Sequence, residues 1–312
     1  MKYTTRDLVE MLTYQRDSGS RMEMIFIRKY LDSIPAMRSD RYGNRYIIIG
    51  GKQDTMFTAH TDTVHTRNST RQRVYVHDGI AMTDGRSILG ADDTTGVWLL
   101  LNLIAEKKPG HYIFQRHEER GGVGSGYSSQ RERPHIKKVI SLDRKGFTDI
   151  ITHQGTRTCS DEFANALAKA IGGGYRPSRG GIFTDSANYA YNIPECTNVS
   201  IGYLNAHTPR ETQSLSHAEW LCKRLLKIDF SKLPVVRDPK ETFDNFYDYK
   251  GFDDSWERAE KEYEDWWKKQ EKKDLRYEPY EPYNPFESST TAFGWNSKSY
   301  NPKRKKKKGE WW

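Results

Sequence analysis

Apolar positions recur along the first 230 residues in two spacings, one helical and one extended. Spacings of three and four residues predict amphipathic helices. Short apolar runs bounded by glycine, proline or aspartate predict strands. The expected helices cover 5–16, 20–33, 94–108, 160–172 and 216–228, with a short one over 184–192. The expected strands cover 45–49, 55–60, 111–116, 137–143 and 196–203, with a meander over 73–89.

Strands that alternate with amphipathic helices are typical of an α/β protein. We therefore expect a three-layer α/β sandwich around a mostly parallel mixed sheet. Residues 1–234 carry the aliphatic side chains that such a core needs and form one predicted domain. No internal repeat interrupts this pattern.

The chain changes character over residues 235–312. Only three large aliphatic residues occur there, whereas six of the eight tryptophans do. We expect a mostly disordered tail, with one charged helix over 252–273 and a basic end at 303–308. The aromatic helix face would suit a protein partner. The basic run would suit an acidic surface or, less favoured, nucleic acid, and the alternative is a solubilising tail without a partner.

The net charge of +8 lies in the body, because residues 235–312 hold 17 basic and 17 acidic side chains. A basic body attracts anionic groups but is weak support for nucleic-acid binding. None of the three cysteines lies in a C-x-x-C pair, which argues against a disulfide framework. No apolar run approaches the roughly 20 residues of a membrane helix. These features predict a protein of the reducing cytoplasm that is not associated with membranes.

Histidine and carboxylate side chains stand beside the ends of the predicted strands. They are His60, Asp92, Glu118, Glu119, Asp143 and His207. The ends of parallel strands meet at one edge of a sheet, so we expect these side chains to gather there. Two divalent cations need about this set of ligands, together with one carboxylate that acts as a base.

The first two motifs suggest separate roles for neighbouring residues. Asp62 lies two positions after His60 and therefore on the same side of the strand, where it can orient the imidazole. Asp92 in GADDTTG can bridge two metals because a carboxylate has an oxygen for each. Asp93 is better suited to cap the following helix.

The two adjacent glutamates in RHEERGG are also expected to have different roles. Glu119 is suited to be a ligand and Glu118 to be a general base. Each motif alone also has a more ordinary interpretation: a surface His-Asp pair, a helix cap or a charged loop. Only their combination favours a two-metal hydrolase.

The order His, Asp, Glu-Glu, Asp, His resembles the co-catalytic di-zinc peptidases. This superfamily includes zinc aminopeptidases, peptidase T and related carboxypeptidases and deacylases. The segment TDGRSILGADDTTG is especially similar to that of peptidase T, and the resemblance covers roughly residues 5–228.

The resemblance implies a peptide substrate and two zinc ions, with cobalt or manganese as alternatives. His60 and Asp143 would hold one ion, Glu119 and His207 the other, and Asp92 both.

It also implies that Glu118 is the base and that Asp62 orients His60. Asp185 in FTDSAN matches a family position near the substrate pocket.

One departure from the family pattern bears on the substrate. Only 64 residues separate Asp143 from His207, which leaves no room for the lid domain of the peptidase T branch. We therefore expect a single-domain form and favour an aminopeptidase. A carboxypeptidase, a dipeptidase or an amide deacylase on the same scaffold is the alternative. A further one is an inactive metal-binding protein that interacts through its tail.

Overall fold

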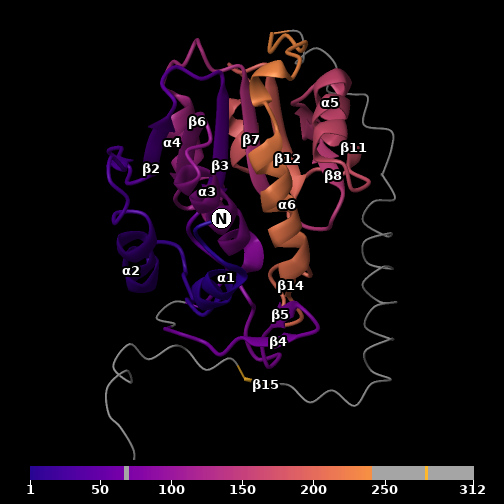
Figure 1. Cartoon of the computed structure of the whole chain (residues 1–312). Helices are drawn as coiled ribbons and strands as arrows, with labels where there is room; N and C mark the ends of the chain where they lie inside the picture. Colours follow the sequence, from indigo (N-terminus) through magenta and orange to yellow (C-terminus); the bar gives the residue numbers. More distant parts are fainter. Residues whose placement is uncertain (67–69, 241–277, 280–312) are drawn as a thin grey trace, which may run out of the picture. The chain divides into compact units, whose positions relative to one another are not determined.

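The computed structural model describes residues 1–66, 70–240 and 278–279. The chain divides by its contacts after Tyr280, and all described residues belong to the first unit. Its centre is an eight-stranded sheet in the order β1-β2-β6-β3-β7-β12-β8-β11 (Figure 1). The helix expected over 252–273 and the basic end at 303–308 lie outside the described residues.

The sheet is mixed and mostly parallel, as predicted. Strands β6, β3, β7 and β12 run parallel to one another, and β2 and β8 run antiparallel to their neighbours β6 and β12. The strands are β1 Arg38–Ser39, β2 Arg45–Ile49, β3 Thr55–His60, β6 Gly110–Gln115, β7 Lys138–Arg144, β8 Asp149–Ile151, β11 Arg176–Ser178 and β12 Glu195–Ser200.

Helices flank the sheet (Figure 1). They are α1 Thr5–Leu12, α2 Arg21–Tyr30, α3 Ala91–Ala105, α4 Val123–Ser129, α5 Asp161–Ile171 and α6 Leu215–Lys227, with the short 3₁₀ turns η1 Glu118–Arg120, η2 Asp185–Tyr189 and η3 Phe230–Lys232. Alternate strand residues enter two separate cores. Phe57 and Ile140 belong to the larger core, which contains the apolar side chains of α1, α3 and α6. Met56 and Val139 belong to the smaller core, which contains Tyr189 of η2.

A second sheet is antiparallel, and one of its loops carries a residue of the predicted site. It has the order β13-β14-β5-β4-β15. Its strands are β4 Tyr75–His77, β5 Ile80–Met82, β13 Tyr203–Leu204, β14 Thr212–Ser214 and β15 Glu278–Pro279. The loop between β13 and β14 contains His207. A two-residue ladder, β9 His153–Gln154 with β10 Thr156–Arg157, completes the strands.

Short polar side chains start several helices. Thr4 and Asp7 form a reciprocal capping box at α1. Ser160 accepts the N–H of Phe163 at 3.1 Å, so it caps α5 as the sequence predicts. Helix α3 begins at Ala91, three residues before the expected start. Asp93 nevertheless accepts the N–H of Gly96 at 2.9 Å, which is the capping bond expected of it.

Helix α4 has the sequence VGSGYSS and was not expected, because glycine and serine are poor helix formers. Close packing explains it. The N–H of Gly124 donates to the carbonyl oxygen of Arg116 at 3.0 Å, and Asn44 donates to the carbonyl of Gly124 at 3.0 Å. A Cβ at position 124 would stand 2.2 Å from that Arg116 oxygen. Position 124 therefore requires glycine, because any side chain there would collide with the backbone of Arg116.

The interval between Asp143 and His207 builds the edge of the main sheet and no separate domain. It contributes β8, β11 and β12, with α5 and η2 between them. The first residues after Pro234 attach to this edge, because Glu195 of β12 accepts the N–H groups of Val236 and Arg237 at 2.8 and 3.0 Å. Among the described helices, none combines the length and apolarity that a membrane crossing requires.

Candidate metal centre

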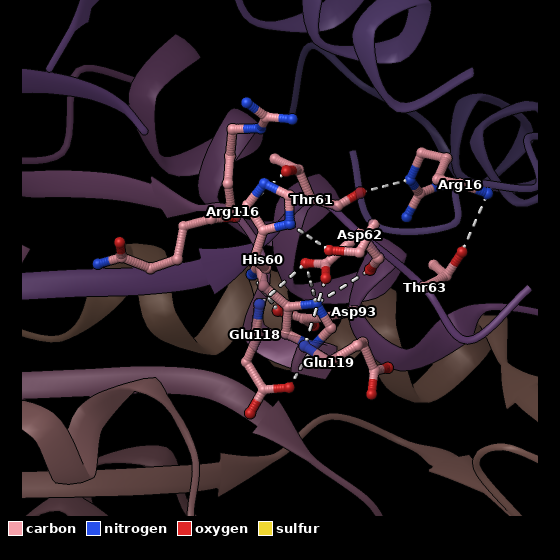
Figure 2. A network of polar contacts seen from close by, with 12 residues as sticks. Arg16, His60, Thr61, Asp62, Thr63, Asp93, Arg116, Glu118 and Glu119 are labelled. Atoms are coloured by element: carbon pink, nitrogen blue, oxygen red, sulfur yellow. Dashed lines mark hydrogen bonds and ion pairs between the residues drawn. The ribbon is translucent and has the colours of Figure 1, made fainter. Parts of the chain in front are cut away.

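The residues predicted to form the site come together at the carboxyl ends of the central parallel strands. His60 ends β3, Asp143 lies near the end of β7, and Glu118 and Glu119 form η1 directly after β6. Figure 2 shows His60 beside the acidic pair and Asp62. Strands that are far apart in sequence are neighbours in this sheet, so the open-sheet rule locates the site.

Asp92 lies between the two histidines. Its Oδ1 is 3.0 Å from Nε2 of His60, and its Oδ2 is 3.2 Å from Nε2 of His207. Each carboxylate oxygen therefore faces a different imidazole. This is the geometry that a carboxylate shared by two cations requires.

Each histidine has a further carboxylate beside it. Oδ1 of Asp143 is 3.6 Å from Nε2 of His60, and Oε1 of Glu119 is 3.1 Å from Nε2 of His207. Asp92, Glu119 and His207 form one group whose ligand atoms all lie within 4.8 Å of one another. His60 and Asp143 form another with Asp93, although both Asp93 oxygens already accept backbone N–H groups.

Glu118 stands at the edge of this arrangement. Its Oε2 is 4.0 Å from Nε2 of His60, farther than the carboxylates of Asp92 and Asp143. It also groups with His60 and Glu119 within 4.8 Å. Glu118 is thus close to the cluster but belongs neither to the His60–Asp143 pair nor to the His207–Glu119 pair.

Asp62 acts on both sides of the site. Its backbone carbonyl lies 3.0 Å from Nδ1 of His60, so the Nδ1–H donates to it and Nε2 is left facing the carboxylates. Its carboxylate accepts the N–H groups of Glu118 and Glu119 at 3.2 and 3.3 Å. Asp62 therefore positions the acidic pair as well as the imidazole (Figure 2).

The loop that follows β3 is supported by a buried ionic network (Figure 2). Arg16 is fully buried, and its Nε donates to the carbonyl of Thr61 at 2.7 Å. Burial lowers the pKa of Arg16 to about 10, which still leaves it charged at neutral pH. Glu23 accepts the Thr61 hydroxyl at 2.7 Å and a side-chain N–H of Arg116 at 3.0 Å. Both strand ends, at β3 and β6, are therefore fixed to the same carboxylate.

Three positioning residues were not identified from the sequence. Buried Glu211 accepts the N–H groups of Gly90 and Asp92 at 2.7 and 3.1 Å. Asn198 of β12 pairs with the backbone N–H and carbonyl of Asp143 at 3.0 and 2.9 Å. The Tyr203 hydroxyl donates to the Asp143 carbonyl at 3.1 Å. None of the three lies in a local sequence pattern that would have revealed its role, because each acts on a backbone group far away in the chain.

Asp185 begins η2 and is 1% exposed. Within the described part of the chain its Oδ1 has no hydrogen-bond partner. Burial, with the nearby charges of Asp62 and Glu119, raises its pKa to about 7. Asp185 is therefore a buried carboxyl group that feels the charges of the acidic cluster.

Without metal ions, the buried carboxylates of the cluster repel one another. Burial and the charges of neighbouring carboxylates raise the pKa values of Asp143 and Glu118 well above their usual range. Burial acts in the same direction on Asp92, but hydrogen bonds from His207 and His60 outweigh it and lower its pKa. The same bonds, to Asp92 and Glu119, raise the pKa of His207 to about 11.

This donor set fits two divalent cations. Imidazole nitrogens and carboxylate oxygens are ligands of zinc and related metals. Cations at this position would also neutralise carboxylates that otherwise repel one another in a buried place.

Comparison with known proteins supports the fold. No family model matches the sequence, and no curated protein matches it. Solved structures do match. The aminopeptidase PepT from Bacillus cereus ATCC 10987 gives a TM-score of 0.57 at 16% identity, over 72% of this chain and 96% of that chain.

Two archaeal structures agree with this result. The TET1 peptidase of Pyrococcus horikoshii, which can assemble into a tetrahedron or a large octahedral shell, gives a TM-score of 0.54 at 15% identity, over 72% of this chain and 98% of that chain. Aminopeptidase APDkam598 from Desulfurococcus kamchatkensis gives 0.51 at 14% identity, over 80% and 99%. The described body of the chain therefore has the fold that these aminopeptidases share.

Proposed function

We propose that the protein is a metal-dependent aminopeptidase that hydrolyses the N-terminal bond of peptides with two zinc ions. The observation that carries this proposal is the position of Asp92, whose two oxygens face His60 and His207 separately at 3.0 and 3.2 Å. A structural ion pair would not need a second histidine and two further carboxylates around the same side chain. The names of the structural neighbours support the peptidase class.

The ligands follow from the shortest contacts in the cluster. His60 and Asp143 would hold one ion, Glu119 and His207 would hold the other, and Asp92 would be shared by both. Cobalt or manganese would suit the same nitrogen and oxygen atoms. Asp93 is excluded as a ligand in this proposal because both its oxygens accept backbone N–H groups.

Glu118 is the proposed general base. Two bound cations would lower the pKa of an attacking water and stabilise negative charge on the carbonyl oxygen. The Glu118 carboxylate then accepts the proton of that water and passes it to the leaving amine.

Other residues of the chain hold the reacting groups in place. Asp62 fixes the backbone of Glu118 and the tautomer of His60. Glu211 fixes the turn that carries Asp92. Asp185 is proposed to line the substrate side of the cluster, because its buried oxygen lies beside the acidic pair without a partner.

The preference for an aminopeptidase over a carboxypeptidase rests on architecture. Residues between Asp143 and His207 build the sheet edge, so this interval supplies no lid that could bind a substrate carboxylate. The reducing cytoplasm remains the proposed compartment, because Cys159, Cys196 and Cys222 are all free and buried.

A panel of short peptides tests the proposal. The full chain, supplied with zinc or cobalt, is assayed on free, N-acetylated and C-amidated forms of one tripeptide. An aminopeptidase cleaves the free and amidated forms and leaves the acetylated form intact. Cleavage of the free and acetylated forms but not of the amidated form would instead indicate a carboxypeptidase. Release of acetate from the acetylated form would indicate a deacylase.

The Glu118→Gln variant and metal analysis separate an enzyme from an inactive metal-binding protein. Glutamine keeps the shape of the side chain but cannot accept the proton. We expect the variant to bind about two metal ions per chain and to lose activity by at least about 100-fold. Glu219→Gln on the exposed side of α6 is the matched control. Metal-loaded wild type that cleaves no peptide or amide would overturn the enzyme assignment.

A further inference from the structure

Three large apolar side chains are exposed beside the candidate metal centre. Val123 is 44% exposed, Ile182 is 71% exposed and Phe183 is 48% exposed. Val123 begins α4 directly after the turn that holds the acidic pair, and the other two lie just before Asp185. We call these three residues the apolar rim.

The two halves of the rim meet at Gly122. This glycine has a φ of +66°, and a Cβ on it would stand 2.9 Å from Cε1 of Phe183. The Phe183 ring therefore lies against the bare backbone between η1 and α4. The N–H of Gly122 donates to the carbonyl of Glu118 at 2.8 Å, so the ring sits one turn away from the proposed base.

The same junction is fixed by polar contacts beneath the ring. The Asn188 side chain donates to the carbonyl of Gly122 at 3.1 Å and to the Ser125 hydroxyl at 2.7 Å. These bonds join η2 to α4. The rim is consequently held at a constant place relative to Glu118.

We propose that the apolar rim receives the side chain of the substrate's N-terminal residue, so that the enzyme prefers peptides that begin with a large apolar residue. This inference rests on the proposed aminopeptidase function. In such a substrate the first side chain is attached to the carbon next to the carbonyl under attack. It must therefore lie near Glu118, and the rim adjoins the turn that carries Glu118.

Solvent-exposed apolar surface is unfavourable unless something covers it, because each Å² removed from water contributes roughly 25 cal/mol. Binding pockets are typically apolar with a few polar groups that fix orientation. The rim beside the acidic cluster has this composition. The competing occupant is a second copy of the chain, which would cover the same residues by association.

Substrate preference tests the proposal on the full-length, metal-loaded protein. Leu-Gly-Gly, Phe-Gly-Gly, Ala-Gly-Gly and Asp-Gly-Gly are compared by kcat/KM. We expect the leucine and phenylalanine peptides to exceed the alanine peptide by about tenfold or more. Phe183→Ser should reduce that ratio by about fivefold or more. Phe183→Leu should restore most of the ratio.

Ile48→Ser is the matched control, since Ile48 is 49% exposed on β2 and is not part of the rim. It should leave the ratio unchanged. A wild type that cleaves all four peptides equally would overturn the rim proposal and leave the aminopeptidase function intact. The rim proposal also fails if Phe183→Ser alters the mass in solution by light scattering without altering the ratio.

A binding measurement keeps the two proposals separate if turnover is absent. In the Glu118→Gln variant with zinc, calorimetry should show Leu-Gly-Gly binding about tenfold more tightly than Ala-Gly-Gly. Adding Phe183→Ser should remove that difference. Equal binding of both peptides, or binding of neither, would overturn the rim as a side-chain pocket whatever the activity of the wild type.

Discussion

The carboxylate of Asp62 accepts the backbone N–H of Glu118 at 3.2 Å, across the ends of two neighbouring parallel strands. The same carboxylate accepts the N–H of Glu119 at 3.3 Å. One buried side chain on the β3 side therefore determines where the two acids on the β6 side stand. A change at Asp62 therefore tests how strongly activity depends on the exact placement of Glu118 and Glu119.

Asp62→Asn should impair catalysis without unfolding the protein. The amide presents one acceptor oxygen where the carboxylate presents two, so one of the two N–H groups loses its partner. We expect kcat/KM to fall by about 10–100-fold, as is usual for residues that orient metal ligands. Steady-state kinetics and a melting curve measure the two effects. Asp17→Asn is the control. The Asp17 carboxylate pairs with the largely exposed side chain of Arg120 at 3.1 Å, so this change should alter kcat/KM by less than about twofold.

Glu211→Gln should weaken metal binding. Both oxygens of Glu211 accept backbone N–H groups in the turn before α3, and the amide nitrogen of glutamine would face one of these donors. Metal affinity should fall by about tenfold or more, measured by competition with a coloured chelator. Glu219→Gln should have no effect, because Glu219 pairs with Lys223 within helix α6. An unchanged affinity in Glu211→Gln would show that the turn holds Asp92 without this side chain.

Glu118→Gln should stabilise the metal-free protein at alkaline pH. Burial and neighbouring carboxylates raise the folded-state pKa of Glu118, so its charged form destabilises the folded protein as pH rises above the unfolded value. The neutral amide removes this penalty. In a chelator at pH 8 the variant should therefore melt higher than wild type, and the gap should close toward pH 4.

Zinc should stabilise both proteins, by about 2.7 kcal/mol at a hundredfold excess over the dissociation constant. A variant that melts lower than wild type in chelator at pH 8 would show that the carboxylates do not repel one another in the metal-free state.

His65 should make the protein less stable in mild acid. Burial, with the charge of Arg16, lowers its pKa to about 4. A depressed folded-state pKa gives stability that is present above the unfolded value near 6.5 and is lost as pH falls toward 4. The loss attributable to His65 is on the order of 3 kcal/mol. Urea unfolding at pH 7 and pH 5 should show a smaller difference for His65→Gln than for wild type, and equal differences would refute this account.

Two glycines in helix α4 should respond in opposite directions to alanine. A Cβ at Gly124 would stand 2.2 Å from the Arg116 carbonyl oxygen, whereas at Gly126 the nearest atom is the Asn188 side-chain nitrogen at 3.9 Å. Gly124→Ala should destabilise the protein by about 1–3 kcal/mol. Gly126→Ala should stabilise it by about 0.5–1 kcal/mol through helix propensity. Chemical unfolding of both variants measures the difference.

The alternation of apolar runs was sufficient to predict the layers of the fold and most of the elements near the site. Strands β3, β6 and β7 lie where their apolar residues predicted them, and His60 and Asp143 follow from the ends of those strands. Helix α4 could not be predicted in this way. Its glycines are explained by contacts with Arg116 and Asn44, residues far from it in the sequence.

The residues that position the site could not be predicted for a similar reason. Glu211 acts on backbone N–H groups about 120 positions earlier, and no local pattern records such a partner. The sequence motif around His207 identified this residue as a candidate ligand. It did not predict its backbone conformation, which has a φ of +64° in an exposed loop. The partner of the segment after 240 stays a prediction from composition: a protein, an acidic surface, nucleic acid as the less favoured choice, or none.

The loop between β13 and β14 brings one of the five proposed ligands from the second sheet. His207 faces Asp92 and Glu119, which stand more than 80 residues earlier in the chain. A chain that grows from its N-terminus on the ribosome therefore presents four of the five ligands before the last one exists. The cluster cannot close until the segment beyond β12 has been synthesised and has folded back, so a partly made chain carries the acids of the site without its proposed activity.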